Sequence, residues 1–229
     1  MIPDDDATLL AQMRERLTSS LIGDILDNLG YRQQFLPPRL RALDPDKPLA
    51  GRAMPVLESD YLTPEESPGA SPLGEKPFGL MLEALDDLRP DEVYIASGSS
   101  PRYALWGGLM TLRALQLGAA GAVLNGYSRD TQEILSTPFP VFSYGSYGQD
   151  QGPRGKVIDY RVPIEIEGVR VDPGDLLFGD VDGVVVIPQA IEKETVARAL
   201  QKGDAEDRVR NAILEGMSTV EAFRTFGVM

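Results

Sequence analysis

The spacing of apolar residues predicts two short amphipathic helices at the start of the chain. Residues 6–17 repeat apolar positions at helical spacing, and the aspartates before them can cap a helix and complement its dipole. A second helix is expected over residues 20–28, where Ser19 or Ser20 can serve as the N-cap and Gly30 follows the last turn. A Pro-Pro step and an extended segment come next.

The middle of the chain alternates between helical and strand patterns. The pattern predicts a helix over 78–88, a strand over 93–97, a helix over 109–117 and a strand over 120–125. Such alternation is typical of α/β layering. Beyond Pro138 the apolar positions form short runs separated by Gly, Pro and Asp turns, which predicts a β-rich sheet or partial barrel.

The end of the chain returns to a helical pattern. A helix is expected over residues 189–214, and Ser218 and Glu221 form a capping box for a last short helix. No linker separates the α/β part from the β-rich part, so residues 1–229 are expected to form a single domain. The stretch 59–77 is dense in Pro, Gly and Ser and indicates a long loop, either a lid or subunit contact or a plain surface connection.

The charge of the chain argues against several partners. Lys and Arg number 22 and Asp and Glu number 35, which leaves a formal net charge of −13 at pH 7. Phosphate backbones and anionic membranes would be repelled, so no nucleic acid partner is expected. No apolar run approaches the ~18 residues of a spanning helix, and the acidic start MIPDDDATLL lacks the features of a signal peptide. We therefore expect a cytoplasmic protein with no membrane partner.

Two residue types are missing, and their absence restricts the chemistry. The chain has no Cys and no His. This excludes thiol nucleophiles, Ser-His pairs, phosphohistidine carriers and His-ligated zinc. Any metal must be held by carboxylates, carbonyls and water, which favours a hard ion such as Mg²⁺ or Mn²⁺.

A Gly-Gly step marks the first candidate ligand site. Gly107 and Gly108 lead into the helix predicted at 109–117, so the N–H groups of Gly108, Leu109 and Met110 are expected to point out of its first turn. The helix dipole favours a carboxylate or phosphate at such a place. A glycine step before a helix is more commonly only a turn, so this feature needs support from its neighbours.

The next predicted strand supplies that support, because Arg129 and Asp130 follow its end. Ligands of α/β sheets collect beyond the carboxyl ends of strands. Arg offers a planar fork of donors for a carboxylate or enolate, and Asp offers a hard oxygen ligand for a cation. Taken alone the pair indicates an exposed turn, but the helix start and the strand end belong to one unit and are expected to face one small cleft.

Two further acidic clusters are weaker candidates. The cluster at 204–208 is typical of the solvated face of a helix. The other, within residues 171–188, is interpreted as turns between buried strands rather than as a metal loop, and its acidic members are Asp172, Asp175, Asp180 and Asp182.

Several segments together resemble a known family. The run GGLM…GAAGAVLNGYSRD, then PVFSYG, then VPIEIEGVRVDPGDLLFGDVDGVVVIP is similar to the RraA-like family, which includes 4-hydroxy-4-methyl-2-oxoglutarate / 4-carboxy-4-hydroxy-2-oxoadipate aldolases. The resemblance extends from SLIGDILDNLG to the final EAFRTFGV. It implies an α/β fold, an αββα sandwich with a swivelling β/β/α-type central β layer. It also implies homotrimers or homohexamers with active sites between subunits.

The resemblance implies roles for particular residues as well. The family's aldolases are metal-dependent and make pyruvate. Arg129 would hold the pyruvate carboxylate and the enolate oxygen, Asp130 would ligate Mg²⁺ or Mn²⁺, and the amides of Leu109 and Met110 would complete the carboxylate cradle. Glu206 resembles the acidic residue that a neighbouring subunit lends to the water shell of the metal.

One position departs from the family pattern. The aldolases commonly carry Asp or Glu after the first Gly of the loop, where this chain has Gly108. A carboxylate that would orient the proton-carrying water is therefore missing at this position, which leaves open whether the substrate is the same oxo acid.

The resulting hypothesis is a class II pyruvate aldolase, a lyase that cleaves a 4-hydroxy-2-oxo acid into pyruvate and a second carbonyl compound. Oxaloacetate decarboxylation passes through the same enolate and is expected as a side activity. The competing hypothesis is a non-catalytic regulator that binds a protein partner, as some family members bind ribonuclease E. A Schiff-base aldolase is disfavoured, because the five lysines lie in turn or charged contexts: Lys47, Lys76, Lys156, Lys193 and Lys202.

Overall fold

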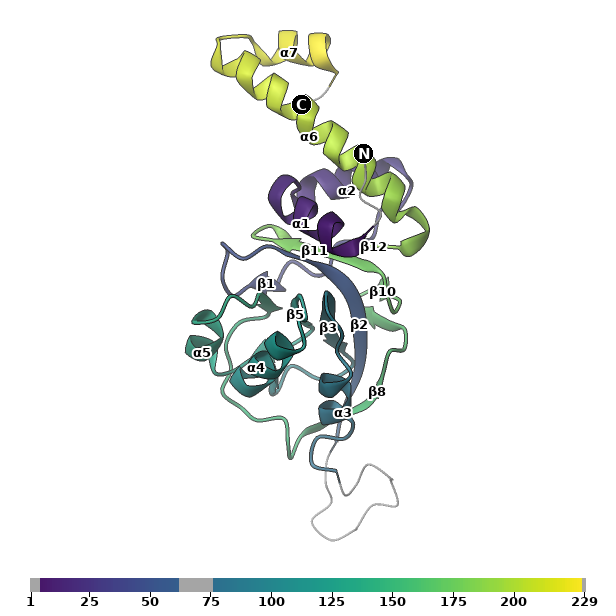
Figure 1. Cartoon of the computed structure of the whole chain (residues 1–229), viewed down its shortest axis with the longest axis vertical. Helices are drawn as coiled ribbons and strands as arrows, with labels where there is room; N and C mark the ends of the chain where they lie inside the picture. Colours follow the sequence, from purple (N-terminus) through teal and green to yellow (C-terminus); the bar gives the residue numbers. More distant parts are fainter. Residues whose placement is uncertain (1–4, 62–75, 228–229) are drawn as a thin grey trace.

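Strands from all parts of the chain form one large curved sheet in the computed structural model, which describes residues 5–61 and 76–227 (Figure 1). The longest strand, β2 (Leu49–Asp60), pairs with neighbours on both of its edges. In spatial order the sheet consists of β1 (Arg41–Ala42), β7 (Val141–Ser143), β5 (Gly121–Leu124), β3 (Glu92–Ser97), β2, β11 (Leu176–Asp180) and β12 (Gly183–Ile187), with β8 (Gly155–Tyr160) paired to β2.

The strand directions divide this sheet into two parts. β2, β3, β5 and β7 are parallel, whereas β8, β11 and β12 are antiparallel to their neighbours. The β-rich character predicted after Pro138 is confirmed, since β7, β8, β11 and β12 lie there, and these strands join the sheet that β2, β3 and β5 form. The late strands join the early sheet because β2 is long enough to pair with β11 near its start and with β8 near its end.

Two small ladders complete the β structure. β4 (Ala104–Trp106) and β6 (Tyr127–Ser128) pair in parallel. β9 (Ile164–Ile166) and β10 (Val169–Val171) form an antiparallel hairpin whose apolar residues belong to the same buried cluster as residues of β2, β3 and β5.

Helices cover both sides of the β layer, as expected for the RraA-like α/β fold (Figure 1). On one side, residues of α1, α2 and α6 share an apolar cluster with β11 and β12. On the other side, α3 and α4 pack with β3, β4 and β5 around Trp106. The helices are α1 (Asp6–Arg16), α2 (Ser19–Asn28), α3 (Met81–Asp86), α4 (Gly108–Gln116), α5 (Thr131–Leu135), α6 (Glu192–Leu214) and α7 (Thr219–Phe226).

The end of the chain forms an arm that leaves the sheet. A 3-10 turn, η1 (Gln189–Ile191), leads into α6, whose first half packs on α1 and α2 through Val196 and Leu200. Figure 1 shows the second half of α6 leading away from the sheet, with α7 at its far end. Leu214 and Phe223 on this arm are exposed.

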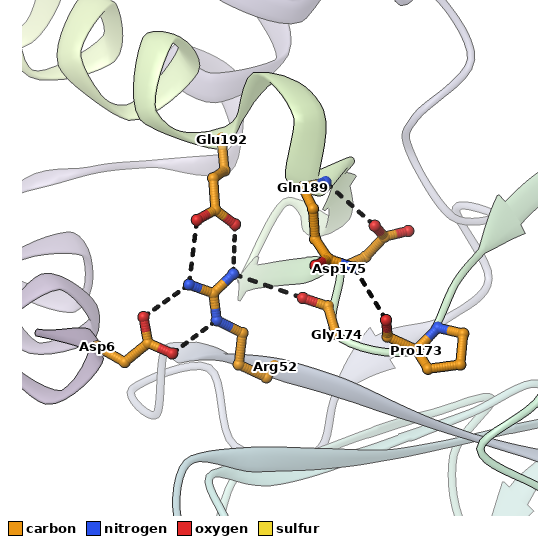
Figure 2. A network of polar contacts seen from close by, with 7 residues as sticks. All are labelled: Asp6, Arg52, Pro173, Gly174, Asp175, Gln189 and Glu192. Atoms are coloured by element: carbon orange, nitrogen blue, oxygen red, sulfur yellow. Dashed lines mark hydrogen bonds and ion pairs between the residues drawn. The ribbon is translucent and has the colours of Figure 1, made fainter.

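A central arginine connects this arm to the body. Arg52 of β2 forms ion pairs with Asp6 of α1, at 2.6 Å, and with Glu192 at the start of α6 (Figure 2). It also donates to the carbonyl of Gly174. The bonds to Asp6 and Glu192 raise the pKa of Arg52 above its usual value. One guanidinium therefore holds the first helix, the central strand and the last long helix together.

Most predicted helix positions are confirmed, and the exceptions are a shorter α3, an α5 that was not predicted and a different cap for α2. The helices predicted at 6–17, 20–28 and 109–117 each lie within one residue of α1, α2 and α4. The helix predicted at 78–88 is shorter, since only α3 is helical there. The cap of α2 is Thr18, whose Oγ1 accepts a hydrogen bond from the N–H of Leu21, and not Ser19 or Ser20 as predicted.

Three other predictions concern the chain ends and the long loop. Ser218 caps α7 as predicted, with its Oγ accepting from the N–H of Glu221 at 3.2 Å. Most of the stretch 59–77 lies outside the described residues, and Ser59 and Asp60 are the last residues of β2. None of the helices in the described ranges is long and apolar enough to cross a membrane.

Candidate active site

The β4–β6 ladder places the two predicted ligand-binding segments side by side. β4 ends at Trp106 and β6 ends at Ser128, which are register partners. The N–H of Arg129 donates to the carbonyl of Trp106 at 2.9 Å. Because the two strands are parallel, Gly107 and Arg129 leave the ladder at the same end.

The first turn of α4 presents free backbone donors at this end. The N–H of Gly108 donates to Oδ2 of Asp130 at 3.1 Å. The N–H groups of Leu109 and Met110 donate to no residue within the described ranges, so they are available to an anion. A Cβ on Gly107 would lie 2.8 Å from Oδ2 of Asp130, so the close approach of this carboxylate requires glycine there.

The backbone of Asp130 explains how its carboxylate reaches α4. Asp130 has φ 56° and ψ 36°, in the left-handed region, and it is the N-cap residue of α5. Few residues other than Gly adopt this conformation, and Asp and Asn are among them. The sharp turn at Asp130 ends β6 and directs the carboxylate toward Gly108.

A second carboxylate orients Arg129. The Nη1 of Arg129 donates to Oδ1 of Asp150 at 2.7 Å, and its Nε lies 3.7 Å from Oδ2 of Asp130. The Arg129 side chain is 40% exposed, so the rest of its guanidinium can still meet a ligand. Asp150 was not among the predicted site residues, because it lies in a loop 21 residues further along the chain and has no local pattern to mark it.

A third carboxylate occupies the position that a side chain on residue 108 would take. A Cβ built on Gly108 would overlap the carboxylate of Glu133, which belongs to α5. At position 108, where a carboxylate was expected to be missing, the carboxylate of Glu133 fills the space. One feature of the sequence could have indicated Glu133, because it lies three residues after Asp130 and residues at this spacing share a face of a helix.

Arg129, Asp130 and Asp150 border a cavity of about 250 Å³, which suits a ligand of a few carbon atoms. One wall is apolar and comes from α3, β4 and the start of α4. Another part of the lining is polar. The polar wall contains Arg129, Asp130, Asp150 and Gln151, and the apolar wall includes Phe78, Met81, Leu82, Leu85, Trp106, Leu109 and Met110.

A larger and more open hollow of about 740 Å³ lies by Tyr103, Arg102 and Arg154. It contains none of the predicted site residues, so size alone does not mark the site. No lysine lines the 250 Å³ cavity within the described residues. All five lysines were predicted to lie in turn or charged contexts, and this is wrong for Lys156, which lies buried in β8.

The charges around the cavity favour a bound cation. Asp130 and Asp150 line the cavity and Glu133 lies against Gly108, so nearby carboxylates outnumber the single lining cation Arg129. An anionic ligand would be repelled unless a positive ion joined it. No group of three metal-binding side chains exists among residues 5–61 and 76–227. Mg²⁺ and Mn²⁺ do not require one, since they bind through one or two carboxylates with water and substrate oxygens. The chemistry of the Asp130 and Glu133 oxygens fits such an ion.

Other predicted acidic residues lie elsewhere. Glu206 is in α6, where it pairs with Lys202 at 3.2 Å, and it does not line the cavity of its own chain. The aspartates of residues 171–188 stabilise turns and helix ends. Asp175, for example, accepts from the N–H groups of Asp172 and Gln189, and burial raises its pKa.

The fold and the site define a mixed α/β protein with a small, carboxylate-rich cavity at the end of two parallel strands. The chain belongs to the RraA-like family, because the family model described as Aldolase/RraA matches residues 19–186.

Three known proteins illustrate this relationship. The chain is 30% identical to protein DlpA of Legionella pneumophila over 225 residues, which cover 98% of this chain but only 34% of DlpA. It therefore spans about a third of that relative. It is 33% identical to the 4-hydroxy-4-methyl-2-oxoglutarate aldolase of Thermus thermophilus over 97 residues, 42% of this chain and 58% of that one. The chain is also similar to the solved structure of Streptomyces coelicolor RraAS2, a member of the RNase ES inhibitor RraA family. The two share the same fold, with a TM-score of 0.76 and 24% sequence identity, and the match covers 90% of this chain and 98% of the RraAS2 chain.

Proposed function

We propose that the protein is a divalent-metal-dependent lyase that cleaves a 4-hydroxy-2-oxo acid to pyruvate and a second carbonyl compound. The observation that carries this proposal is the convergence of Arg129, Asp130 and Glu133 on the free amides of α4 beside one small cavity. The aldolase name of the Thermus relative supports it.

Arg129 and the start of α4 would bind the carboxylate end of the substrate. The guanidinium of Arg129, held by Asp150, provides planar donors, and the N–H groups of Leu109 and Met110 provide two more. The apolar wall excludes water from the carbon skeleton, which strengthens the electrostatic contacts of the polar wall.

Asp130 would hold Mg²⁺ or Mn²⁺, and the negative charge of Glu133 beside Gly108 would favour the same cation. When bound, the ion would supply Lewis-acid polarisation of the 2-keto oxygen. It would also offset the surplus of negative charge that the three carboxylates create around the cavity.

The remaining steps depend on this chain's own residues. As the 4-hydroxyl loses its proton, the bond between C3 and C4 breaks, and its electron pair forms the enolate of pyruvate. Arg129 stabilises the negative charge that develops on oxygen, and the enolate then takes a proton at C3. Glu133 is the carboxylate best placed to exchange protons, because it lies over Gly108 beside Asp130. Loss of CO₂ from oxaloacetate gives the same enolate, so decarboxylation would be a side reaction.

We also propose that the site is completed in a homotrimer or homohexamer. Within one chain Glu206 does not line the cavity, so any role in catalysis would require a neighbouring subunit. The exposed apolar residues of the C-terminal arm offer a surface for such a contact.

The test is a screen of 4-hydroxy-2-oxo acids and oxaloacetate with Mg²⁺ and Mn²⁺. Arg129→Ala should lower kcat at least ~10²-fold, the usual effect of removing one donor to a developing oxyanion. Asp130→Ala should weaken the dependence on metal. Arg113→Ala and Asp86→Ala break an exposed ion pair of α3 and α4 and are the matched controls. Wild-type rates in both site variants would refute the proposal.

Two results would redirect the assignment. A covalent adduct trapped by borohydride with a 2-oxo acid would indicate a Schiff-base mechanism instead. No turnover of any 2-oxo acid with either metal would favour the second candidate, a non-catalytic regulator that binds a protein partner, a function in keeping with the RraA part of the family.

A further inference from the structure

A buried glutamate lies directly behind the polar wall of the cavity. Glu58 of β2 is 1% exposed, and its Oε2 accepts a hydrogen bond from Nε2 of Gln151 at 2.7 Å. Gln151 itself lines the cavity beside Arg129 and Asp150. One side-chain amide therefore contacts the cavity on one side and an internal carboxyl group on the other.

The surroundings of Glu58 do not favour a charge. Its Oε1 is buried and has no hydrogen-bond partner within the described residues. The hydroxyl of Tyr94, in the adjacent strand β3, is likewise buried without a hydrogen-bond partner in that part of the chain. Burial raises the pKa of Glu58 to about 8, although the bond from Gln151 opposes this shift. A carboxyl group of purely structural value would have both oxygens paired, because an unpaired buried oxygen is costly.

Few other charges face this group. From β3, Tyr94 is itself buried, and burial also raises its pKa. From the loop before β4, Tyr103 bonds to Asp60, and its pKa is likewise raised by burial. From β8, Lys156 directs its Nζ to the carbonyl of Lys76, at 2.5 Å, and to the ring of Tyr61. The charged groups that line the cavity are Arg129, Asp130 and Asp150, and Arg129 pairs with both carboxylates.

We propose that Glu58 is a positioning residue that makes binding of the anionic 2-oxo acid conditional on its own proton, acting through the amide of Gln151. This inference depends on the proposed function, since it concerns the ligand of the same cavity. An ionised Glu58 accepts from Nε2 of Gln151, which leaves the amide oxygen as the group available to the cavity. A protonated Glu58 can donate to that oxygen instead, and the amide can then turn its N–H toward a bound carboxylate.

Charge and hydrogen bonding act in the same direction. An ionised Glu58 repels an anion through a medium of low polarity, and it also holds the amide with its oxygen toward that anion. Binding of a 2-oxo acid should therefore weaken as the pH rises through the pKa of Glu58. By linkage, the bound acid should raise that pKa further.

The experiment measures the Kd of pyruvate in the presence of Mg²⁺ by calorimetry from pH 6 to pH 9.5, with oxaloacetate turnover over the same range. Pyruvate stays anionic throughout, so its own titration does not contribute. For the wild type we expect Kd to rise on the order of tenfold between pH 7 and pH 9. Glu58→Gln keeps the shape and the hydrogen bond without a titrating proton, so its Kd should stay nearly constant and match the wild-type value at pH 7.

Two further measurements separate a positioning role from a structural one. Gln151→Met should fold but show a smaller pH dependence, because the connecting amide is gone and only the direct repulsion by an ionised Glu58 remains. Carbon-13 NMR of the glutamate carboxyl groups should show Glu58 titrating at higher pH when pyruvate is bound. Glu215→Gln, an exposed site at the end of α6, is the control and should leave every profile unchanged.

The outcomes distinguish the two proposals. If the wild type turns over 2-oxo acids but Glu58→Gln retains the wild-type pH profile of Kd, the role of Glu58 is refuted while the proposed function stands. If the wild type neither binds pyruvate nor turns over any 2-oxo acid, the proposed function fails and this inference fails with it. Circular dichroism of each variant excludes a folding defect as the cause of a lost signal.

Discussion

The buried carboxyl of Glu58 should make the stability of the protein fall with pH. Its pKa is raised from 4.5 to about 8 in the folded state, so between these values the folded protein holds a proton that the unfolded chain has lost. Stability therefore falls as the pH rises through this window, and it levels off above pH 8. Each unit of pKa difference corresponds to about 1.4 kcal/mol, so the full loss approaches about 5 kcal/mol.

Glu58→Gln removes this titration while preserving the bond partner of Gln151. The free energy of unfolding of the variant minus that of the wild type should therefore increase by several kcal/mol from pH 5 to pH 9. Urea unfolding at pH 5, 7 and 9 would measure it, and the single Trp of the chain, the buried Trp106, is the fluorescence probe. Protein concentration is kept constant because subunit association would add to the apparent stability.

The comparison with a control variant decides the result. Glu215→Gln removes a carboxylate from an exposed position and should follow the wild-type pH dependence. Should Glu58→Gln and the wild type change in parallel from pH 5 to pH 9, Glu58 would not be a protonated buried acid, and the reasoning from its burial would be wrong.

Three further predictions follow from the site and its supports. Gly108→Asp should displace Glu133 and lower oxaloacetate turnover about tenfold or more. The double variant Gly108→Asp/Glu133→Ala should recover activity, because one carboxylate then occupies that space. Equal turnover in the single and double variants would contradict this prediction. Arg52→Met should lower the free energy of unfolding, measured in urea, by about 1–3 kcal/mol, because Glu192 loses its partner at the start of α6. An unchanged midpoint of urea unfolding would show that this ion pair is dispensable. EDTA should abolish turnover and Mg²⁺ or Mn²⁺ should restore it, with activity in metal-free buffer as the opposing result.

Local patterns were sufficient for most of the helices and for half of the candidate site. Gly107, Gly108, Arg129 and Asp130 are all close to one predicted helix–strand unit, and parallel β pairing brings them to one end. Their proximity could be inferred because the chain has few ways to connect a helix to the next strand of a parallel sheet. The missing Cys and His likewise restrict the chemistry on the basis of residue type alone.

Distant contacts could not be inferred in this way. From its place in the loop, Gly108 indicates the loss of a carboxylate, whereas packing puts the carboxylate of Glu133 in that space. Glu58 and Gln151 are 93 residues apart, and nothing in either segment indicates that they meet. The sequence pattern did not indicate that the late strands pair with the early ones, because periodicity reports which residues are buried but not the partner that buries them.

The amino-acid sequence by itself therefore determined most helix positions, the residue types available for chemistry and the family resemblance, since these depend on residue type and on short spacings. Only the tertiary structure decided which carboxylates surround Arg129 and which glutamate is sealed behind Gln151. The physical reason is that side chains brought together by packing depend on the volume and direction of every neighbour. The absence of a side chain at position 108, for example, is explained only by the carboxylate of Glu133, which occupies the space beside it.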